Sequence, residues 1–192
     1  MKISIFITVI SIFLSSCYTS SADKSEDLLF RGVKAYYNSK NEYMTRLIFE
    51  EVASRKETAS SCQKAYANVY LAKLKLKKGD VESAIRLLDK AENICKNFPY
   101  KYELLRDFYM LHCKNDFAQK YNNLLAKWIE NRIAQVDDGE FDVDKLEFIN
   151  VRSCVNGEKE REFFPMYDLK EHKEFRAQLY KKYLRNKLLN ID

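Results

Sequence analysis

The stretch that decides the fold is Lys64–Pro99, KAYANVYLAKLKLKKGDVESAIRLLDKAENICKNFP, where two apolar patterns of helical spacing meet at a glycine and an aspartate. Gly79 can adopt the left-handed conformation that ends a helix, and Asp80 can cap the next one. The apolar residues of the two patterns are Ala65, Val69, Ala72 and Leu76, then Val81, Ala84, Ile85, Leu88 and Ala91. This spacing predicts two antiparallel helices that form a hairpin.

The hairpin resembles a tetratricopeptide repeat, in which small side chains let two antiparallel helices approach closely. The matching positions are Leu71 and Ala72 in the first helix, Gly79 and Asp80 in the turn, and Ala84 and Ala91 in the second helix. Asn68 replaces the usual tryptophan, and Pro99 lies about three residues later than the proline of the pattern. We therefore expect the second helix to run slightly long.

Weaker copies of the pattern flank the hairpin. The segment before it, LLFRGVKAYYNSKNEYMTRLIFEEVAS, has Gly32 and a turn near Asn41. The segment after it, YELLRDFYMLHCKNDFAQKYNNLLAKW, has a turn at Asn115 and Asp116. Three units are about the minimum for a stable stack, so the repeats predict an array over residues 27–136.

The remaining residues, 137–192, have no clear period until a final apolar stripe. We expect loops, a short helix near Asp144–Asn150, and a last helix with capping-box spacing at Asp168 and Glu171. The stripe consists of Phe175, Leu179, Tyr180, Tyr183, Leu184 and Leu188. Four glycines and two prolines disfavour a turn-rich β fold. The predicted fold class is all-α: antiparallel helical hairpins stacked as a short TPR-like solenoid with a C-terminal capping helix.

The first residues predict a signal peptide followed by a site of lipid attachment. A lysine and the apolar run Ile3–Leu14 are typical of a signal peptide, and the run is too short to span a bilayer. LSSC, ending at Cys17, resembles the lipobox of bacterial lipoproteins. The resemblance implies a signal peptide over 1–16, lipidation of Cys17, and a tether over 17–26; an ordinary secretory signal is the alternative. Tyr18, in place of an aspartate, favours the outer membrane facing the periplasm, with the cell surface as another possibility.

The other cysteines are candidates for disulfides in an oxidising compartment. Cys62 and Cys95 lie at the two ends of the hairpin, and antiparallel packing brings those ends together. We therefore expect a Cys62–Cys95 bond, which leaves Cys113 to pair with Cys154; four free thiols are the alternative.

No pattern predicts a catalytic, metal or cofactor site. His112, Cys95, Cys113 and Cys154 could ligate zinc, but the usual ligand spacings are absent. The acidic stretch VDDGEFDVDKLEF places the wrong residues at calcium-ligand positions. Basic and acidic residues, 33 and 28, are mixed along the chain, so we expect no nucleic-acid partner. We also expect no small-molecule substrate and no enzyme activity.

The tetratricopeptide resemblance also implies a concave groove that the first helix of each repeat lines. The corresponding positions are Tyr36, Tyr37, Tyr66, Lys73, Lys77, Tyr102, Tyr109 and His112. Tyrosines are common in binding surfaces, and the lysines favour an acidic partner; the alternative is that many tyrosines pack between helices.

The sequence therefore predicts a lipid-anchored envelope adaptor or scaffold that binds another envelope protein or peptide. Its architecture resembles that of helical-repeat lipoproteins of barrel assembly and the pilotins of pilus systems, which implies a role in envelope or secretion-machinery assembly. The alternative is a surface lipoprotein that binds a host or extracellular ligand.

Overall fold

The structure is a computed structural model, which describes residues 21–38, 41–55, 59–143, 146, 152–155, 158–161 and 173–189. Its elements are α2 (Ser21–Asn38), α3 (Glu42–Ser54), α4 (Ser61–Lys77), α5 (Val81–Ile94), α6 (Tyr100–Leu111), α7 (Asn115–Asp137), β1 (Arg152–Val155), β2 (Glu158–Arg161) and α8 (Lys173–Leu189). The predictions for residues 1–16, Cys17, Asp168 and Glu171, and most of the short helix near 144–150, fall outside these residues.

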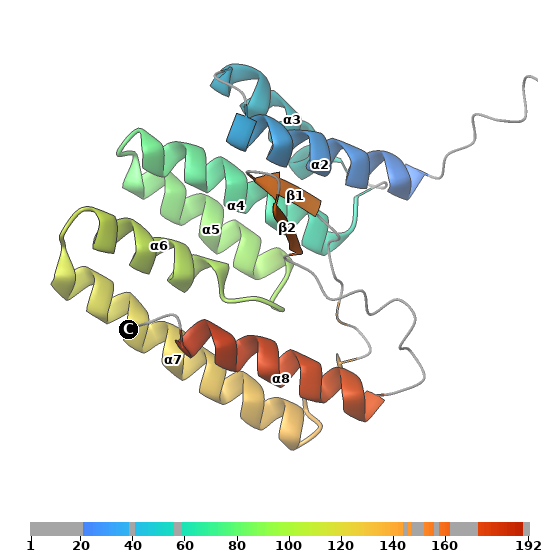
Figure 1. Ribbon diagram of the computed structural model, residues 1–192, viewed down its shortest axis with the longest axis vertical. Helices are drawn as coiled ribbons and strands as arrows, with labels where there is room; N and C mark the ends of the chain where they lie inside the picture. The colour runs from blue at the N-terminus through green and yellow to red at the C-terminus, as the bar shows by residue number, and fades with distance from the viewer. Residues whose placement is uncertain are drawn as a thin grey trace, which may run out of the picture.

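Helices α2 to α7 lie side by side in chain order, and each packs against the next (Figure 1). They form the antiparallel hairpins α2–α3, α4–α5 and α6–α7, while α8 packs against α7. Helix α4 also contacts α2 and α6, which places it at the centre of the array. The predicted helical architecture, with stacked hairpins and a final helix, is confirmed.

The turn of the central hairpin has the predicted chemistry. Gly79 has a φ of +75°, and Asp80 Oδ1 accepts a hydrogen bond from the Ser83 N–H at 3.2 Å. Ser60 and Gln63 form a capping box at the start of α4. Helix α5, however, ends at Ile94 and does not run long, because Cys95 is extended and begins the connection to α6.

Small residues allow the helices to approach closely. Ala72, Ala84 and Ala91 are buried where α4 and α5 pack. Gly32 has the same role between α2 and α3, because a Cβ atom there would lie 2.8 Å from a ring carbon of Phe49. The alanines that match the repeat pattern therefore lie in the core, as the sequence predicts.

Overpacking at these alanines is expected to destabilise the central hairpin. Ala84→Leu or Ala91→Leu adds volume where the structure leaves no space, so we expect a loss of about 1 to 3 kcal/mol in the free energy of unfolding. Urea denaturation followed by circular dichroism measures it. The matched control is Ala134→Leu on the exposed surface of α7, expected to change stability by less than about 0.5 kcal/mol. Equal losses of stability from leucine at Ala84, Ala91 and Ala134 would contradict the close packing of α4 against α5 at the two buried alanines.

An antiparallel β-hairpin was not predicted. Strands β1 and β2 pair with Arg152 opposite Arg161 and Val155 opposite Glu158, and β1 lies beside α2 (Figure 1). A loop was expected here because this part of the sequence has no clear period; the two strands are short and rich in charged residues. The available signal was the Asn-Gly dipeptide at 156–157, which favours tight hairpin turns.

Candidate partner-binding surface

Part of the predicted groove forms one surface, which consists of Tyr36, Tyr37, Lys73 and Lys77 and is called the Tyr36–Lys77 surface below. Lys77 Nζ lies 3.9 Å from the centre of the Tyr36 ring. The Tyr36 and Tyr37 rings meet edge to face at 5.1 Å, and Tyr37 is 44% exposed. The surface therefore joins α2 and α4, the first helices of two successive hairpins.

The core supports this surface through Tyr70 of α4, which is fully buried. The Tyr70 ring meets Tyr36 edge to face at 5.1 Å, and Lys73 Nζ lies 4.4 Å from the centre of the Tyr70 ring. Burial, followed by the nearby charge of Glu42, raises the pKa of Tyr36 above its usual value. The Tyr36 hydroxyl is thus protonated at neutral pH, and the surface presents phenol rings beside two ammonium groups.

The other predicted groove residues do not join this surface. Tyr66 is only 3% exposed and packs between the rings of Tyr70 and Tyr100. Its placement in the groove was wrong, because α4 is enclosed by its neighbours on most sides. His112 is exposed at the end of α6, where its Nδ1 atom lies 2.8 Å from the Phe108 carbonyl oxygen.

Tyr109 faces α7 instead of a groove shared with α2 and α4. Its ring stacks on those of Phe117 and Tyr121, with centroids 5.0 and 5.7 Å apart. Tyr109 therefore packs between the helices of the third hairpin, which was the alternative left open by the sequence.

Tyr102 belongs to a polar contact between α5 and α6. Its hydroxyl donates a hydrogen bond to Glu92 at 3.4 Å, and Lys101 Nζ lies 2.5 Å from Asp89. Burial opposes the charged form of Lys101, but the hydrogen bond and the charge of Asp89 outweigh it and raise the Lys101 pKa. These contacts hold two hairpins together.

The Cys62–Cys95 disulfide is present, with its Cα atoms 5.0 Å apart. It joins the start of α4 to the end of α5, so this pairing is confirmed. Cys113 is a free, exposed thiol in the α6–α7 turn, whereas Cys154 lies in β1 beside α2. The predicted Cys113–Cys154 pair was wrong, because the strand is placed against the first hairpin and the turn belongs to the third.

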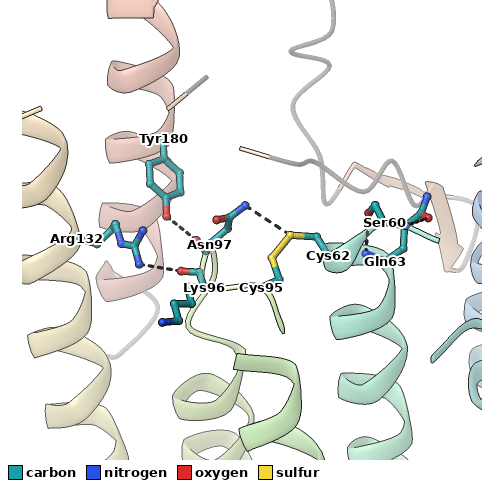
Figure 2. Close-up of a disulfide and its surroundings, with 8 residues drawn as sticks. All are labelled: Ser60, Cys62, Gln63, Cys95, Lys96, Asn97, Arg132 and Tyr180. Atoms are coloured by element: carbon teal, nitrogen blue, oxygen red, sulfur yellow. Dashed lines mark hydrogen bonds between the residues drawn. A yellow bond between two sulfur atoms is a disulfide. The ribbon is translucent and has the colours of Figure 1, made fainter. Parts of the chain in front are cut away.

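The connection that follows the disulfide is held by three helices (Figure 2). The Asn97 amide lies 3.6 Å from Cys62 Sγ, and Arg132 of α7 donates to the Lys96 carbonyl at 2.8 Å. Tyr180 of α8 donates to the Asn97 carbonyl, and burial raises the Tyr180 pKa. Residues 95–99 therefore connect the central hairpin to both the third hairpin and the final helix.

A small cavity lined by both polar and apolar side chains lies on the third hairpin, and the sequence did not predict it. Its volume is about 200 Å³, and its walls are Arg106, Met110, Asn115, Ala118, Gln119 and Asn122. The residues come from two helices and have no motif spacing, so the sequence contained no signal for them. Within the described residues, no three His, Cys, Asp or Glu side chains gather as a metal site would require.

No protein-family model matches the chain, and neither a curated protein nor a solved structure matches it. Among the described helices, none combines the length and the apolar composition needed to cross a membrane.

Proposed function

We propose that this chain is a lipid-anchored envelope adaptor that binds another protein through the Tyr36–Lys77 surface. The observation that carries the proposal is the exposed Tyr37 beside Tyr36, with Lys73 and Lys77 on the neighbouring helix. Aromatic rings supply large contact areas with a polar end, and they are enriched in protein interfaces. The two lysines favour a partner that presents carboxylates to these rings.

The architecture supports an adaptor because a stack of rigid hairpins positions side chains from different helices on one surface. The rings of Tyr36, Tyr70 and Phe49 come from α2, α4 and α3 and are packed together. A surface fixed in this way loses little conformational freedom when a partner binds.

The lipid anchor proposed at Cys17 would raise the local concentration of the partner at the membrane. Each buried methylene of an acyl chain contributes about 0.8 kcal/mol, so two or more chains retain a protein stably. The tether predicted over residues 17–26 is shorter than expected, because α2 already begins at Ser21. A short tether keeps the array close to the bilayer, where binding of a second membrane protein is effectively intramolecular.

Site-specific photo-crosslinking in the producing cells tests this function. A benzophenone amino acid replaces Tyr37, and the matched control replaces Phe175 of α8, which is 46% exposed. We expect a discrete protein adduct from position 37 that position 175 does not give, and at least about a fivefold loss of the adduct with Lys73→Glu and Lys77→Glu because the surface charge is reversed. Mass spectrometry then identifies the partner.

Three outcomes would contradict the proposal: adducts to phospholipid alone, equal adducts from both positions, or an adduct that is unchanged by the charge reversal. Cys17→Ser tests the anchor in the same cells, because it should abolish acylation and reduce the adduct. An adduct formed only with proteins added outside intact cells would favour the surface-lipoprotein alternative.

A further inference from the structure

The disulfide and the contacts that dock α8 meet in the same short connection, residues 95–99 (Figure 2). Tyr180 of α8 donates a hydrogen bond to the carbonyl oxygen of Asn97, and the amide of Asn97 donates to Cys62 Sγ at 3.6 Å. The next residue, Phe98, is 5% exposed, and its ring meets the Tyr180 ring edge to face at 6.5 Å. Asn97 and Phe98 therefore link the position of α8 to the sulfur atoms.

The third hairpin holds the same connection through α7. Arg132 donates to the Lys96 carbonyl oxygen at 2.8 Å, and its guanidinium carbon lies 4.1 Å from the centre of the Phe141 ring. The Phe141 ring in turn stacks on that of Tyr180, with centroids 5.5 Å apart. Contacts from α7 and α8 thus fix two successive carbonyl groups that directly follow the disulfide.

The sulfur atoms are enclosed, so access to them requires movement of the connection. Cys62 and Cys95 are 4% and 6% exposed, and the Asn97 amide lies against Cys62 Sγ (Figure 2). A thiol must contact the sulfur atom that it attacks. Exchange therefore requires a local opening of residues 95–99, and such an opening separates Asn97 and Phe98 from α8.

The surroundings of the two sulfur atoms differ. Cys62 is the second residue of α4, which is 17 residues long, and the partial positive charge at a helix N-terminus favours a thiolate. The Asn97 amide donates to this same sulfur. Cys95 instead follows the C-terminal end of α5, where a negative charge is disfavoured. Because the better stabilised thiolate leaves faster, Cys62 is the expected leaving group.

We propose that the Cys62–Cys95 bond is a redox-sensitive latch for α8, which a dithiol opens. One thiolate of the dithiol attacks Cys95 Sγ, the bond between the two cysteines breaks, and Cys62 leaves as a thiolate. The second thiolate of the dithiol then attacks its partner sulfur in the mixed disulfide and releases Cys95. The dithiol is oxidised to a disulfide, and the two cysteines take up its two electrons and two protons. Reduction thereby frees residues 96–98 to move away from α8.

The coupling acts in both directions. If the disulfide stabilises the docked position of α8, then docking of α8 protects the disulfide from reduction by the same factor. Tyr180 and Leu184 are 2% and 0% exposed while α8 is docked. Release of the helix would expose both side chains, so the redox state of the bond controls an apolar surface of α8.

The rate of reduction tests the latch in a chain that keeps its disulfide. Dithiothreitol is added to the purified full chain, and samples are alkylated and analysed by mass spectrometry at intervals. Tyr180→Phe removes only the hydroxyl that donates to Asn97, and we expect reduction to become about three- to tenfold faster. The matched control is Tyr43→Phe, which removes a hydroxyl from a ring that is 62% exposed on α3. We expect its rate to stay within about twofold of the natural chain.

A monothiol identifies the sulfur that leaves. Glutathione is added to the oxidised chain, the reaction is stopped with acid, and the mixed disulfide is located by peptide mapping. We expect the adduct on Cys95, with Cys62 as the free thiol, in at least about fivefold excess over the opposite arrangement. Asn97→Leu should reduce this preference, because it removes the donor to Cys62 Sγ.

Hydrogen exchange measures the release of α8. We expect the amides of α8 to exchange at least about tenfold faster, relative to those of α3, in Cys62→Ala/Cys95→Ala than in the natural chain. Tyr70→Ala is the matched control, because it keeps the disulfide and weakens the core of the first two hairpins, so it should not raise this ratio. If the double-alanine variant does not fold, the reduction rates decide the proposal.

Equal rates of reduction for the natural chain and Tyr180→Phe would overturn the proposal, as would a mixed disulfide mainly on Cys62. An exchange ratio that is unchanged in Cys62→Ala/Cys95→Ala, or raised equally in Tyr70→Ala, would show that the bond stabilises the array as a whole and would also overturn it. None of these measurements depends on the Tyr36–Lys77 surface, so the latch and the adaptor function can fail separately.

Discussion

Replacing Cys62 and Cys95 with alanine is expected to lower the free energy of unfolding by about 3 to 4 kcal/mol. The two residues are 33 apart in sequence, and a cross-link that closes such a loop reduces the entropy of the unfolded chain by this amount. The bond is buried at the end of the central hairpin, so its loss frees the start of α4 and the connection to α6 at once.

Urea unfolding of the oxidised chain, with and without a thiol reductant, measures this effect. The reductant should destabilise the natural chain and leave the double-alanine variant unchanged. Cys113→Ala is the matched control, because Cys113 is exposed and free; we expect a change of less than about 0.5 kcal/mol. A natural chain whose midpoint does not respond to reductant would show that the bond contributes nothing to stability.

Replacing Tyr70 with alanine is expected to cost about 3 to 5 kcal/mol, as is usual for truncation of a buried aromatic residue. The Tyr70 ring stacks on Phe49 of α3 with centroids 4.8 Å apart. It also meets Tyr36 of α2 and Tyr66 of α4 edge to face. One truncation therefore leaves a cavity where the first two hairpins meet.

Thermal and urea melts followed by far- and near-ultraviolet circular dichroism measure the loss. Tyr43→Ala provides the matched control, since Tyr43 is 62% exposed and its truncation removes an equal volume from the surface. The near-ultraviolet signal should weaken in Tyr70→Ala far more than in the control. If both variants melt alike, the aromatic contacts do not hold the hairpins together.

Much of the fold could be predicted because local chemistry and packing agree in the central hairpin. Gly79 and Asp80 require a turn, and the alanines of α4 and α5 can be buried only if the two helices approach closely. Once an antiparallel pair is predicted, the Cys62–Cys95 bond follows from the position of its ends. Each inference depended on residues that are close in sequence or joined by a short turn.

The binding surface was predicted only in part, because helical periodicity does not fix how a helix is rotated against several neighbours. Tyr66 and Tyr109 have suitable spacing for a groove, yet they pack against Tyr100 and α7. Leu111, although apolar, is 83% exposed at the end of α6. Such rotations depend on side-chain volumes in other helices.

The cavity on the third hairpin and the strand pair were not predicted for a different reason. Arg106 and Asn122 line one cavity only because α6 and α7 pack together, and nothing in their sequence spacing predicts this. The strands carry mostly charged residues, so no alternation of apolar and polar positions marks them. The wrong Cys113–Cys154 pair followed from this gap, since the location of β1 beside α2 was unknown.

The covalent link between Cys62 and Cys95 also determines how the chain responds to tension. When the two ends of the chain are pulled, the force is transmitted through the Cys62–Cys95 bond. The residues between these two cysteines therefore cannot be extended. At about 3.3 to 3.6 Å per extended residue, the 33-residue separation removes roughly 110 Å from the maximum extension. The central hairpin therefore keeps its two ends joined when the rest of the chain is pulled straight.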